Sequence, residues 1–567
     1  MMQKVASKHW KLAEKIPAEV EQALSYYPPF FRQILYNRGI TSAEQAMAFL
    51  SAGEDFHDPM LLLNMAGAVE RLLFAVDHQE PIAIYGDYDV DGVSATALLV
   101  EVLRLLGGNV TVYIPNRFEE GYGLNIEALN QLRDQGIGLV LTVDCGIRSL
   151  REAEHARRIG MDLIISDHHQ PLEEIPPANF VICPKQKGDE YPEKNLAGVG
   201  VAYKIAQALL QQRQLELSND RLGLDLVALG TVADVVPLTG ENRLLVKAGL
   251  KELRRGSRIG LRSLAQAARI NLSTLNTADI GFGLAPRLNA AGRLESALAS
   301  YQLLLERDIQ HIGLLVQHLD DQNRERQKIT AEMQQRAEEL IQEEDFEEIL
   351  FAFDESFNPG VVGLVAGKLT ESYYRPAVVG HVNGEYVRAS CRSIPAFHIT
   401  QALDACADLM VHHGGHALAA GFTIHRDHLP ELKERLAKIA FEQLGDLDLR
   451  PVLRADVELP LGELHPEFLK YLHLLEPTGM DNPEVYFISR NVRTSNARAI
   501  GSDGKHLKFL VTDGWITYDA VAFRQGYWME TGLPREVDIL YRFEMNTYNG
   551  RESLQLNIVD IKPAGSD

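Results

Sequence analysis

Short apolar runs alternate with longer amphipathic stretches between residues 81 and 256. Four runs have the length of a buried strand, at 82–85, 139–143, 163–166 and 229–233. Residues 93–106 and 125–135 repeat apolar side chains at helical spacing, and residues 110–115 favour a further strand. This alternation predicts an α/β domain with a doubly wound parallel sheet.

The pattern changes twice further along the chain. Residues 308–345 carry apolar side chains at mostly helical spacing, with no Pro or Gly after Gly313, which predicts one long helix joining two lobes. A second α/β unit follows it. Past residue 450, short alternating segments are separated by Asp-Gly and Asn-Gly turns, the last at Asn549-Gly550, which suggests a small closed β-barrel. We therefore expect five parts: a helical segment (1–75), a parallel-sheet domain (76–305), a long connecting helix (306–346), a smaller α/β domain (347–447) and a barrel (448–567).

Each of the four apolar runs leads directly into acidic or imidazole side chains. These are Asp87, Asp89, Asp91, Asp144, Asp167, His168, His169 and Asp234. The carboxyl ends of parallel strands meet at one edge of a sheet, where so many carboxylates would repel one another without cations. Oxygen and imidazole ligands without thiolates suit Mn²⁺ or Mg²⁺. Two such ions would support in-line phosphoryl displacement, so the pattern predicts phosphoester hydrolysis.

The Asp-x-Asp-x-Asp-Gly sequence at 87–92 is also how an EF-hand calcium loop begins. That loop requires Glu at its twelfth position and a preceding helix, whereas this chain has Leu98 there and an apolar strand before the motif. The EF-hand is therefore excluded.

The composition excludes some classes of protein but does not identify a binding partner. The net charge is −22, which argues against a surface coated for nucleic acid but not against a local basic channel. No apolar run approaches the roughly 18–20 residues of a membrane span. The four cysteines are widely spaced, which fits a reducing cytoplasm better than disulfides or a structural zinc.

Together these motifs resemble the DHH phosphoesterase superfamily and, within it, the RecJ family of bacterial exonucleases. The first resemblance rests on the acidic and histidine motifs above, together with Gly414-Gly415-His416 and Ala419-Ala420-Gly421, which resemble the DHHA1 domain. The narrower one rests on the segments 114–117, 120–123 and 285–293. It implies a DHH domain joined by a long helix to a DHHA1 domain, followed by a nucleic-acid-binding OB-fold barrel.

The resemblance also implies roles for individual residues. The implied metal ligands are Asp87, Asp89, Asp91, Asp144, His168 and Asp234, and the implied catalytic residues are His169, Asp144 and Asp167. The implied DNA contacts are Arg117, Arg287, Arg293, Ser390, Arg392, Gly414, Gly415 and His416. Two positions depart from the family pattern: Asn358 stands where many relatives have His, and Asp481 where relatives tend to have Gly.

The implied activity is a 5′→3′ exonuclease that degrades single-stranded DNA to 5′-mononucleotides in recombination and repair, using two Mn²⁺ or Mg²⁺ ions. Single-strand-binding protein and a helicase are the implied partners of a cytoplasmic monomer without membrane contact. Two alternatives stay open: a DHH phosphatase acting on short oligonucleotides or cyclic dinucleotides, and a non-catalytic DNA-binding scaffold.

Overall fold

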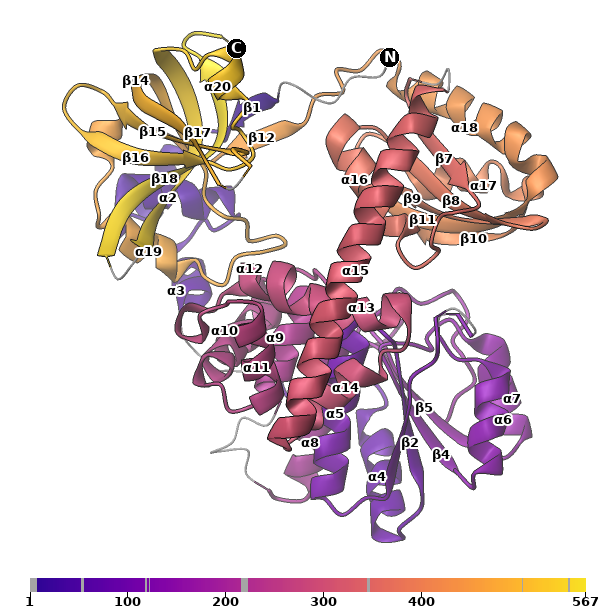
Figure 1. Cartoon of the computed structure of the whole chain (residues 1–567). Coiled ribbons are helices and arrows are strands. Elements are labelled where there is room, and N and C mark those ends of the chain that lie inside the picture. Colours follow the sequence, from indigo (N-terminus) through magenta and orange to yellow (C-terminus); the bar gives the residue numbers. More distant parts are fainter. Residues whose placement is uncertain are drawn as a thin grey trace. The chain divides into compact units, whose positions relative to one another are not determined.

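The computed structural model describes residues 8–51, 56–117, 120–121, 123–215, 223–343, 347–501, 503–548 and 551–566 (Figure 1). By their contacts the residues form two compact units. Unit 1 comprises 1–52, 372–374 and 446–567, and unit 2 comprises 53–371 and 375–445. The expected helical segment 1–75 is thus divided between the two units. The Asn549-Gly550 turn and Tyr122 of the 120–123 segment lie outside the described residues.

A five-stranded parallel sheet forms the centre of unit 2. Its strands are β2 (Ile82–Gly86), β3 (Val110–Tyr113), β4 (Leu139–Val143), β5 (Asp162–Ser166) and β6 (Phe180–Ile182), in the spatial order β3-β2-β4-β5-β6. The chain crosses from β3 at one edge back past β2 to β4, so the strand order reverses between β2 and β4. In open α/β sheets this switch point is where ligands gather.

Both faces of this sheet are covered by helices, as the doubly wound pattern predicts. Ile82, Ile84 and Leu141 face a large core that includes α4 (Met65–Asp77), α5 (Val90–Leu105) and α8 (Gly198–Gln212). The alternate residues Ala83, Tyr85 and Val140 face α6 (Ile126–Asp134) and α7 (Leu150–Arg158). The same core extends through α9 (Leu224–Ala233), α10 (Gly240–Arg255), α11 (Ile259–Ala267), the π-helical turn Ile280–Leu284, α13 (Ala285–Leu294) and α14 (Leu298–Leu305). The short helix α12 (Thr277–Asp279) has no buried residue and leads into the π-helical turn.

One predicted strand is wrong. The apolar run 229–233 is the last part of helix α9, and Asp234 is the residue that caps the helix carboxyl end. Helix α9 is packed against α5, α8 and α10, and seven of its 10 residues are buried. A helix that is apolar all round has no polar face, and a short apolar stretch of it cannot be told from a buried strand by its pattern.

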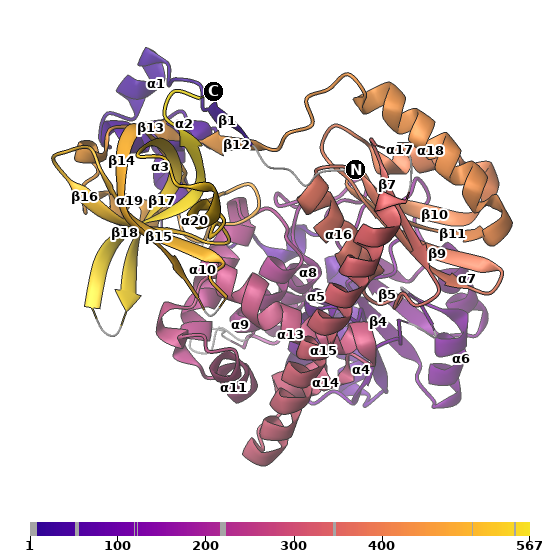
Figure 2. The same cartoon turned by 45° about the horizontal axis from the view of Figure 1, so that its top comes forward.

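Helix α15 (Ile309–Gln342) leads from the first lobe, residues 56–305, to the second lobe, residues 347–445 (Figures 1 and 2). Its 34 residues span about 50 Å at 1.5 Å per residue. It packs against α11, α13 and α14 and then against strand β7. Apolar residues such as Leu315, Leu319 and Met333 are buried along one side.

The second lobe is built on a mixed sheet in the order β10-β11-β9-β8-β7. Only β7 and β8 run parallel, and the other neighbours are antiparallel. Its elements are β7 (Leu350–Asp354), α16 (Val362–Tyr373), β8 (Ala377–Asn383), β9 (Tyr386–Arg392), α17 (Ile399–Asp404), β10 (Met410–His416), β11 (Ala419–His425) and α18 (Leu429–Leu444).

Unit 1 contains the predicted closed barrel. Strands β14 (Phe487–Ile500), β15 (His506–Thr512), β16 (Thr517–Ala522), β18 (Arg551–Pro563) and β17 (Glu536–Tyr548) pair in that order, and β17 pairs back to β14. Strand β14 was not predicted from the sequence. Phe509, Tyr541 and Phe543 fill the barrel interior, whereas Trp515 at the β15–β16 turn is 97% exposed.

The amino-terminal residues pack within the same unit. Strand β1 (His9–Leu12) pairs in parallel with β12 (Val452–Ala455), and the ring of Phe30 stacks on Phe468 at 3.6 Å. The remaining elements here are α1 (Ala18–Ala23), α2 (Pro29–Asn37), α3 (Ala43–Leu50), β13 (Val457–Glu458), α19 (Phe468–Leu474) and α20 (Trp528–Thr531). Among the described residues of the whole chain, none of the helices has both the length and the apolar character needed to cross a bilayer.

Candidate metal centre and nucleic-acid contacts

The acidic motif after β2 is held in a fixed turn by its own side chains. Asp89 caps helix α5: its Oδ1 accepts hydrogen bonds from the backbone N–H groups of Asp91 (2.9 Å) and Gly92 (3.1 Å). Asp91 is buried, and its carboxylate accepts from the N–H groups of Gly198 (2.6 Å) and Val199 (2.9 Å) at the start of α8. A helix amino terminus favours a nearby negative charge, so this contact keeps one carboxylate at the switch point.

Asp144 reaches the same place from strand β4 through a left-handed backbone, with φ of 62°. Its N–H donates to the carbonyl of Ser166 at the end of β5 (3.0 Å). Gly198 packs directly on its carboxylate, because a Cβ on Gly198 would lie 2.7 Å from Oδ1 of Asp144. Only glycine permits this approach of α8 to Asp144.

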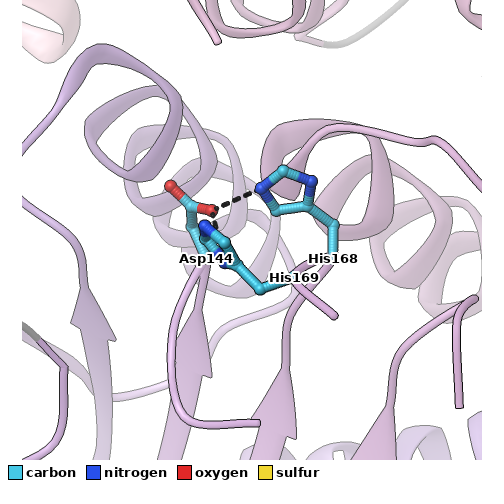
Figure 3. Close-up of side chains that lie close together, drawn as sticks. All are labelled: Asp144, His168 and His169. Carbon is cyan, nitrogen blue, oxygen red and sulfur yellow. Dashed lines mark ion pairs between the residues drawn. The ribbon is translucent and has the colours of Figure 1, made fainter. Parts of the chain in front are cut away.

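His168 is the point at which these carboxylates meet. Its Nε2 atom lies 3.1 Å from Oδ1 of Asp144, 3.5 Å from Oδ2 of Asp234 and 3.9 Å from Oδ2 of Asp91. Figure 3 shows Asp144 with both histidines directed toward it. Three groups have ligand atoms within 4.8 Å of one another: Asp87, Asp89 and Asp144; Asp91, His168 and Asp234; and Asp144, His168 and His169.

The aspartates and histidines of these three groups form what we call the metal rim, and their electrostatics fit divalent cations. Burial, followed by the charges of neighbouring aspartates, raises the pKa of Asp91 to about 7 and that of Asp234 to about 8. The same causes raise the pKa values of Asp87 and Asp144. Oδ1 of Asp87 is buried and has no hydrogen-bond partner among the described residues. Cations among these oxygen and imidazole donors would remove the repulsion, so the residues fit Mn²⁺ or Mg²⁺.

Without divalent cations, we expect the free energy of unfolding to fall as the pH rises from about 4 and to level off above about 8. The pKa values of Asp91 and Asp234 are raised above 3.8 on folding, so the folded chain holds more protons than the unfolded chain in this range. Thermal unfolding midpoints in chelator at pH 5 and pH 8 measure the effect. Asp234→Asn should reduce the difference, and a midpoint that rises with pH would contradict it.

His169 occupies a different position from His168. Its Nδ1 donates to Oδ1 of Asp167 (2.7 Å), which also accepts from the N–H groups of His168 (2.7 Å) and His169 (3.1 Å). Burial acts to lower the pKa of His169, but Asp167 and the nearby aspartates raise it overall. Burial acts to raise the pKa of Asp167, but its hydrogen bond and charge interactions with His169 lower it to about 2. Asp167 is therefore a positioning residue for the His169 ring.

The predicted DNA-contact arginines separate into two kinds. Nε of Arg287 is bound to Oδ1 of Asp320 (2.9 Å), and its Nη1 donates to the carbonyl of Gly283 (2.8 Å), so it fastens α13 to α15. Arg293 instead lies among other cations. Burial and then Arg117, Arg326 and Arg392 act to lower its pKa, which is about 10.

Arg117, Arg293, Arg326 and Arg392 form what we call the arginine group. Asp89 acts on the pKa of Arg293, and Arg117 acts on that of Asp87, so the group adjoins the metal rim. The guanidinium of Arg117 lies 4.1 Å from the centre of the Tyr88 ring. The Nε atoms of Arg117 and Arg326 are buried without a hydrogen-bond partner among the described residues. Clustered guanidinium groups of this kind suit a phosphate.

Ser390 and Arg392 lie on strand β9, and both approach Gly363 at the start of α16. A Cβ on Gly363 would lie 3.1 Å from Nη2 of Arg392 and 3.5 Å from Oγ of Ser390. Gly414, Gly415 and His416 end the exposed edge strand β10. Burial acts to lower the pKa of His416, and so do Arg148, His169 and Lys185, so the imidazole of His416 lies near the metal rim.

Three cationic residues near the rim were not predicted from the sequence: Arg148, Lys185 and Arg326. Lys185 follows strand β6, and Arg148 comes four residues after Asp144. Both residues follow a strand of the parallel sheet, as the acids do, so the sequence contains a signal for them. Arg326 has no such signal, because it lies within the polar middle of α15.

The two departures from the family pattern have local explanations. Oδ1 of Asn358 accepts the N–H of Gly360 (2.8 Å), so Asn358 closes the Pro359-Gly360 turn. The carbonyl of Gly360 in turn accepts from Nη1 of Arg293 (3.4 Å). Asp481 has φ of 56°, a left-handed conformation that glycine adopts freely and that Asp tolerates better than most residues.

Comparison with known proteins identifies three domains of the chain. Residues 81–231 match the model described as "DHH family, N-terminal domain", residues 347–442 match the DHHA1 domain and residues 455–560 match the RecJ OB domain. RecJ of Bacillus subtilis, named a single-stranded-DNA-specific exonuclease, is 38% identical over 96% of this chain and 69% of its own length. The RecJ of Escherichia coli is 34% identical over 97% of both chains.

The fold agrees with that of solved relatives. The crystal structure of Thermus thermophilus RecJ in complex with Mn²⁺ superposes with a TM-score of 0.84 at 30% identity, over 98% of this chain and 80% of that one. The Mg²⁺ complex of the same protein gives a TM-score of 0.78. The matches extend over all three domains and nearly the whole chain, and the chain therefore belongs to the RecJ family.

Proposed function

We propose that this chain removes nucleotides one at a time from the 5′ end of single-stranded DNA and releases them as 5′-mononucleotides. Its family makes it a metal-dependent exonuclease that acts on single-stranded DNA. The observation that carries the mechanism is the convergence of Asp144, His168 and Asp234 at the switch point of the sheet. The natural setting of this activity is recombination and repair.

Two ligand groups support two cation positions, and a third group, which contains Asp144 and His168, links them. Asp87, Asp89 and Asp144 would hold one ion, and Asp91, His168 and Asp234, with Asp144 between the positions, would hold the other. When bound, two divalent cations supply Lewis-acid stabilisation of the attacking and leaving oxygens of an in-line displacement.

His169 has the position of a proton donor. Because its Nδ1 is bound to Asp167, the proton available for transfer is on Nε2. Water adds to the phosphorus of the terminal phosphodiester, the P–O3′ bond breaks, and the 3′ oxygen of the released nucleotide takes a proton. Burial acts to lower the pKa of His169, but its hydrogen bond and charge interaction with Asp167 raise it overall, which favours the protonated imidazole for that step.

The arginine group would hold the 5′-terminal phosphate. It adjoins Asp87 and Asp89, and Ser390 adds a hydroxyl beside Arg392. A charged clamp one nucleotide away from the scissile bond would fix where the strand is cut, which accounts for mononucleotide products.

The alternatives are not favoured. The OB barrel and the second lobe extend well beyond what a phosphatase of cyclic dinucleotides requires, and all six implied metal ligands of a catalytic rim are retained. A non-catalytic scaffold would not need them.

A nuclease assay on 5′-end-labelled single-stranded DNA tests the proposal. With Mn²⁺ or Mg²⁺, the label should appear first as a mononucleotide, while chelator should abolish its release. Blunt duplex of the same sequence should be spared. Release of label as longer oligonucleotides, or digestion from a labelled 3′ end first, would contradict the proposed polarity and product.

The setting of the enzyme is part of the same proposal. A helicase and a single-strand-binding protein would supply and protect its substrate, and the chain would act as a monomer in the cytoplasm. The four cysteines, Cys145, Cys183, Cys391 and Cys406, are buried free thiols, which suits a reducing compartment.

A further inference from the structure

Two cations at the metal rim, Lys185 and Arg148, have no part in the proposed cleavage step. They belong to neither the metal ligands nor the arginine group. Neither forms an ion pair with an acid among the described residues.

Lys185 is brought to the rim by the register of the sheet. Strand β6 pairs in parallel with β5, and Ser166 is opposite Ile182. The carbonyl of Ile182 accepts from the N–H of Asp167 (3.1 Å), and Sγ of Cys183 lies 3.5 Å from the carbonyl of His169. The end of β6 and the residue after it therefore contact the segment 167–169, which contains both histidines.

The side chain of Lys185 is half-buried beside the catalytic groups. Its charge contributes to lowering the pKa values of His168 and His416 and opposes the rise in the pKa of Asp234. A lysine held near a metal ligand without an acid partner retains its attraction for an anion that arrives with the substrate.

Arg148 approaches the same place from the loop after β4. Its Nε donates to the carbonyl of Gln170 (2.9 Å), directly after the histidine pair, and the residue is exposed. Arg148, Lys185 and His169 all act on the pKa of His416, so these three side chains lie in its neighbourhood. In the arginine group, by contrast, Arg117 acts on the pKa of Asp87, and Asp89 acts on the pKa of Arg293.

The metal rim thus has a cationic group beside Asp87 and Asp89 and another beside Asp234 and His169. A strand whose terminal phosphate lies in the arginine group and whose next phosphate is cleaved must place its third phosphate beyond the metals. We propose that Lys185 and Arg148 bind this third phosphate, the first one on the strand that the enzyme retains. This inference rests on the proposed polarity and product.

Substrate length gives a direct test. A 5′-phosphorylated dinucleotide has a terminal and a scissile phosphate but no third one, whereas the 5′-phosphorylated trinucleotide has it. In the Lys185→Ala/Arg148→Ala double variant, we expect the wild-type preference for the trinucleotide, measured as the ratio of kcat/KM values, to fall by about 10-fold to 100-fold, as for a lost charged hydrogen bond. Lys187→Ala and Arg151→Ala replace exposed cations of the same two segments and should keep the wild-type ratio.

A substrate in which a neutral methylphosphonate replaces the third phosphate gives a second test, and its wild-type measurement does not depend on the folding of a variant. In the wild-type enzyme it should raise KM by a similar factor, and in the double variant it should have no further effect. An unchanged preference in the double variant, an equal loss on both substrates, or a full methylphosphonate effect in the variant would overturn the inference. Failure of the wild-type enzyme to release 5′-mononucleotides would instead refute the proposed function itself.

Discussion

Asp144→Ala is expected to lower kcat on single-stranded DNA by about 10³-fold, at the upper end of the loss from removing one preorganised transition-state group. Asp144 belongs to two of the three ligand groups, and its Oδ1 lies 3.1 Å from Nε2 of His168 in the third, so its removal should disturb both proposed cation positions. DNA binding should be largely retained, because the arginine group and Ser390 are untouched. Single-turnover kinetics in Mn²⁺ and a separate binding titration measure the two effects.

A second readout distinguishes loss of metal from loss of folding. Binding of Mn²⁺ to the folded state alone raises the thermal midpoint, and this increase should shrink in Asp144→Ala. Asp134→Ala replaces an exposed acid of the same domain and should behave as wild type in both assays. A folded Asp144→Ala protein with full Mn²⁺-dependent cleavage would refute the two-metal assignment.

His169→Ala is expected to lower kcat by about 10²-fold to 10⁴-fold, the range for loss of a general acid. Metal binding should persist, since His168 rather than His169 lies between Asp144, Asp91 and Asp234. Rates measured with saturating Mn²⁺, together with the Mn²⁺-induced thermal shift, separate the two histidines. His78→Ala, at an exposed histidine of the first lobe, is the matched control.

The pH profile tests the role of Asp167 in the same step. Asp167 helps to raise the pKa of His169, so Asp167→Asn should move the alkaline limb of kcat to lower pH. A variant that loses activity equally at every pH would show that Asp167 has only a structural role.

Much of the site could be predicted because parallel strands impose a simple rule. Residues that follow β2, β4 and β5 must meet at one edge, however far apart they are in sequence. Asp87, Asp144 and His168 are brought together in this way. Asp234 was placed correctly at the rim for the wrong reason, because the run before it is the end of a buried helix and not a strand.

Other features depend on which side chains contact one another, and the spacing of residues along the sequence does not reveal those contacts. Arg287 and Arg293 stand six residues apart on one helix, yet the first is paired with Asp320 and the second lies among other guanidinium groups. The polar middle of α15 has the pattern of a solvated face, but Arg326 from it joins the same group. Which acid reaches which arginine is decided by packing between distant segments.

The sequence by itself determined the class of fold, the edge of the sheet at which chemistry occurs and the kind of ion that suits it. These follow from local periodicity and from the residue types at strand ends, which short stretches of chain already contain. Only the tertiary structure decided that α9 supplies Asp234, that Asp167 holds the His169 ring and that the cations form two groups at the rim. These outcomes depend on contacts between residues far apart in the chain, whose distances are set by how whole elements pack.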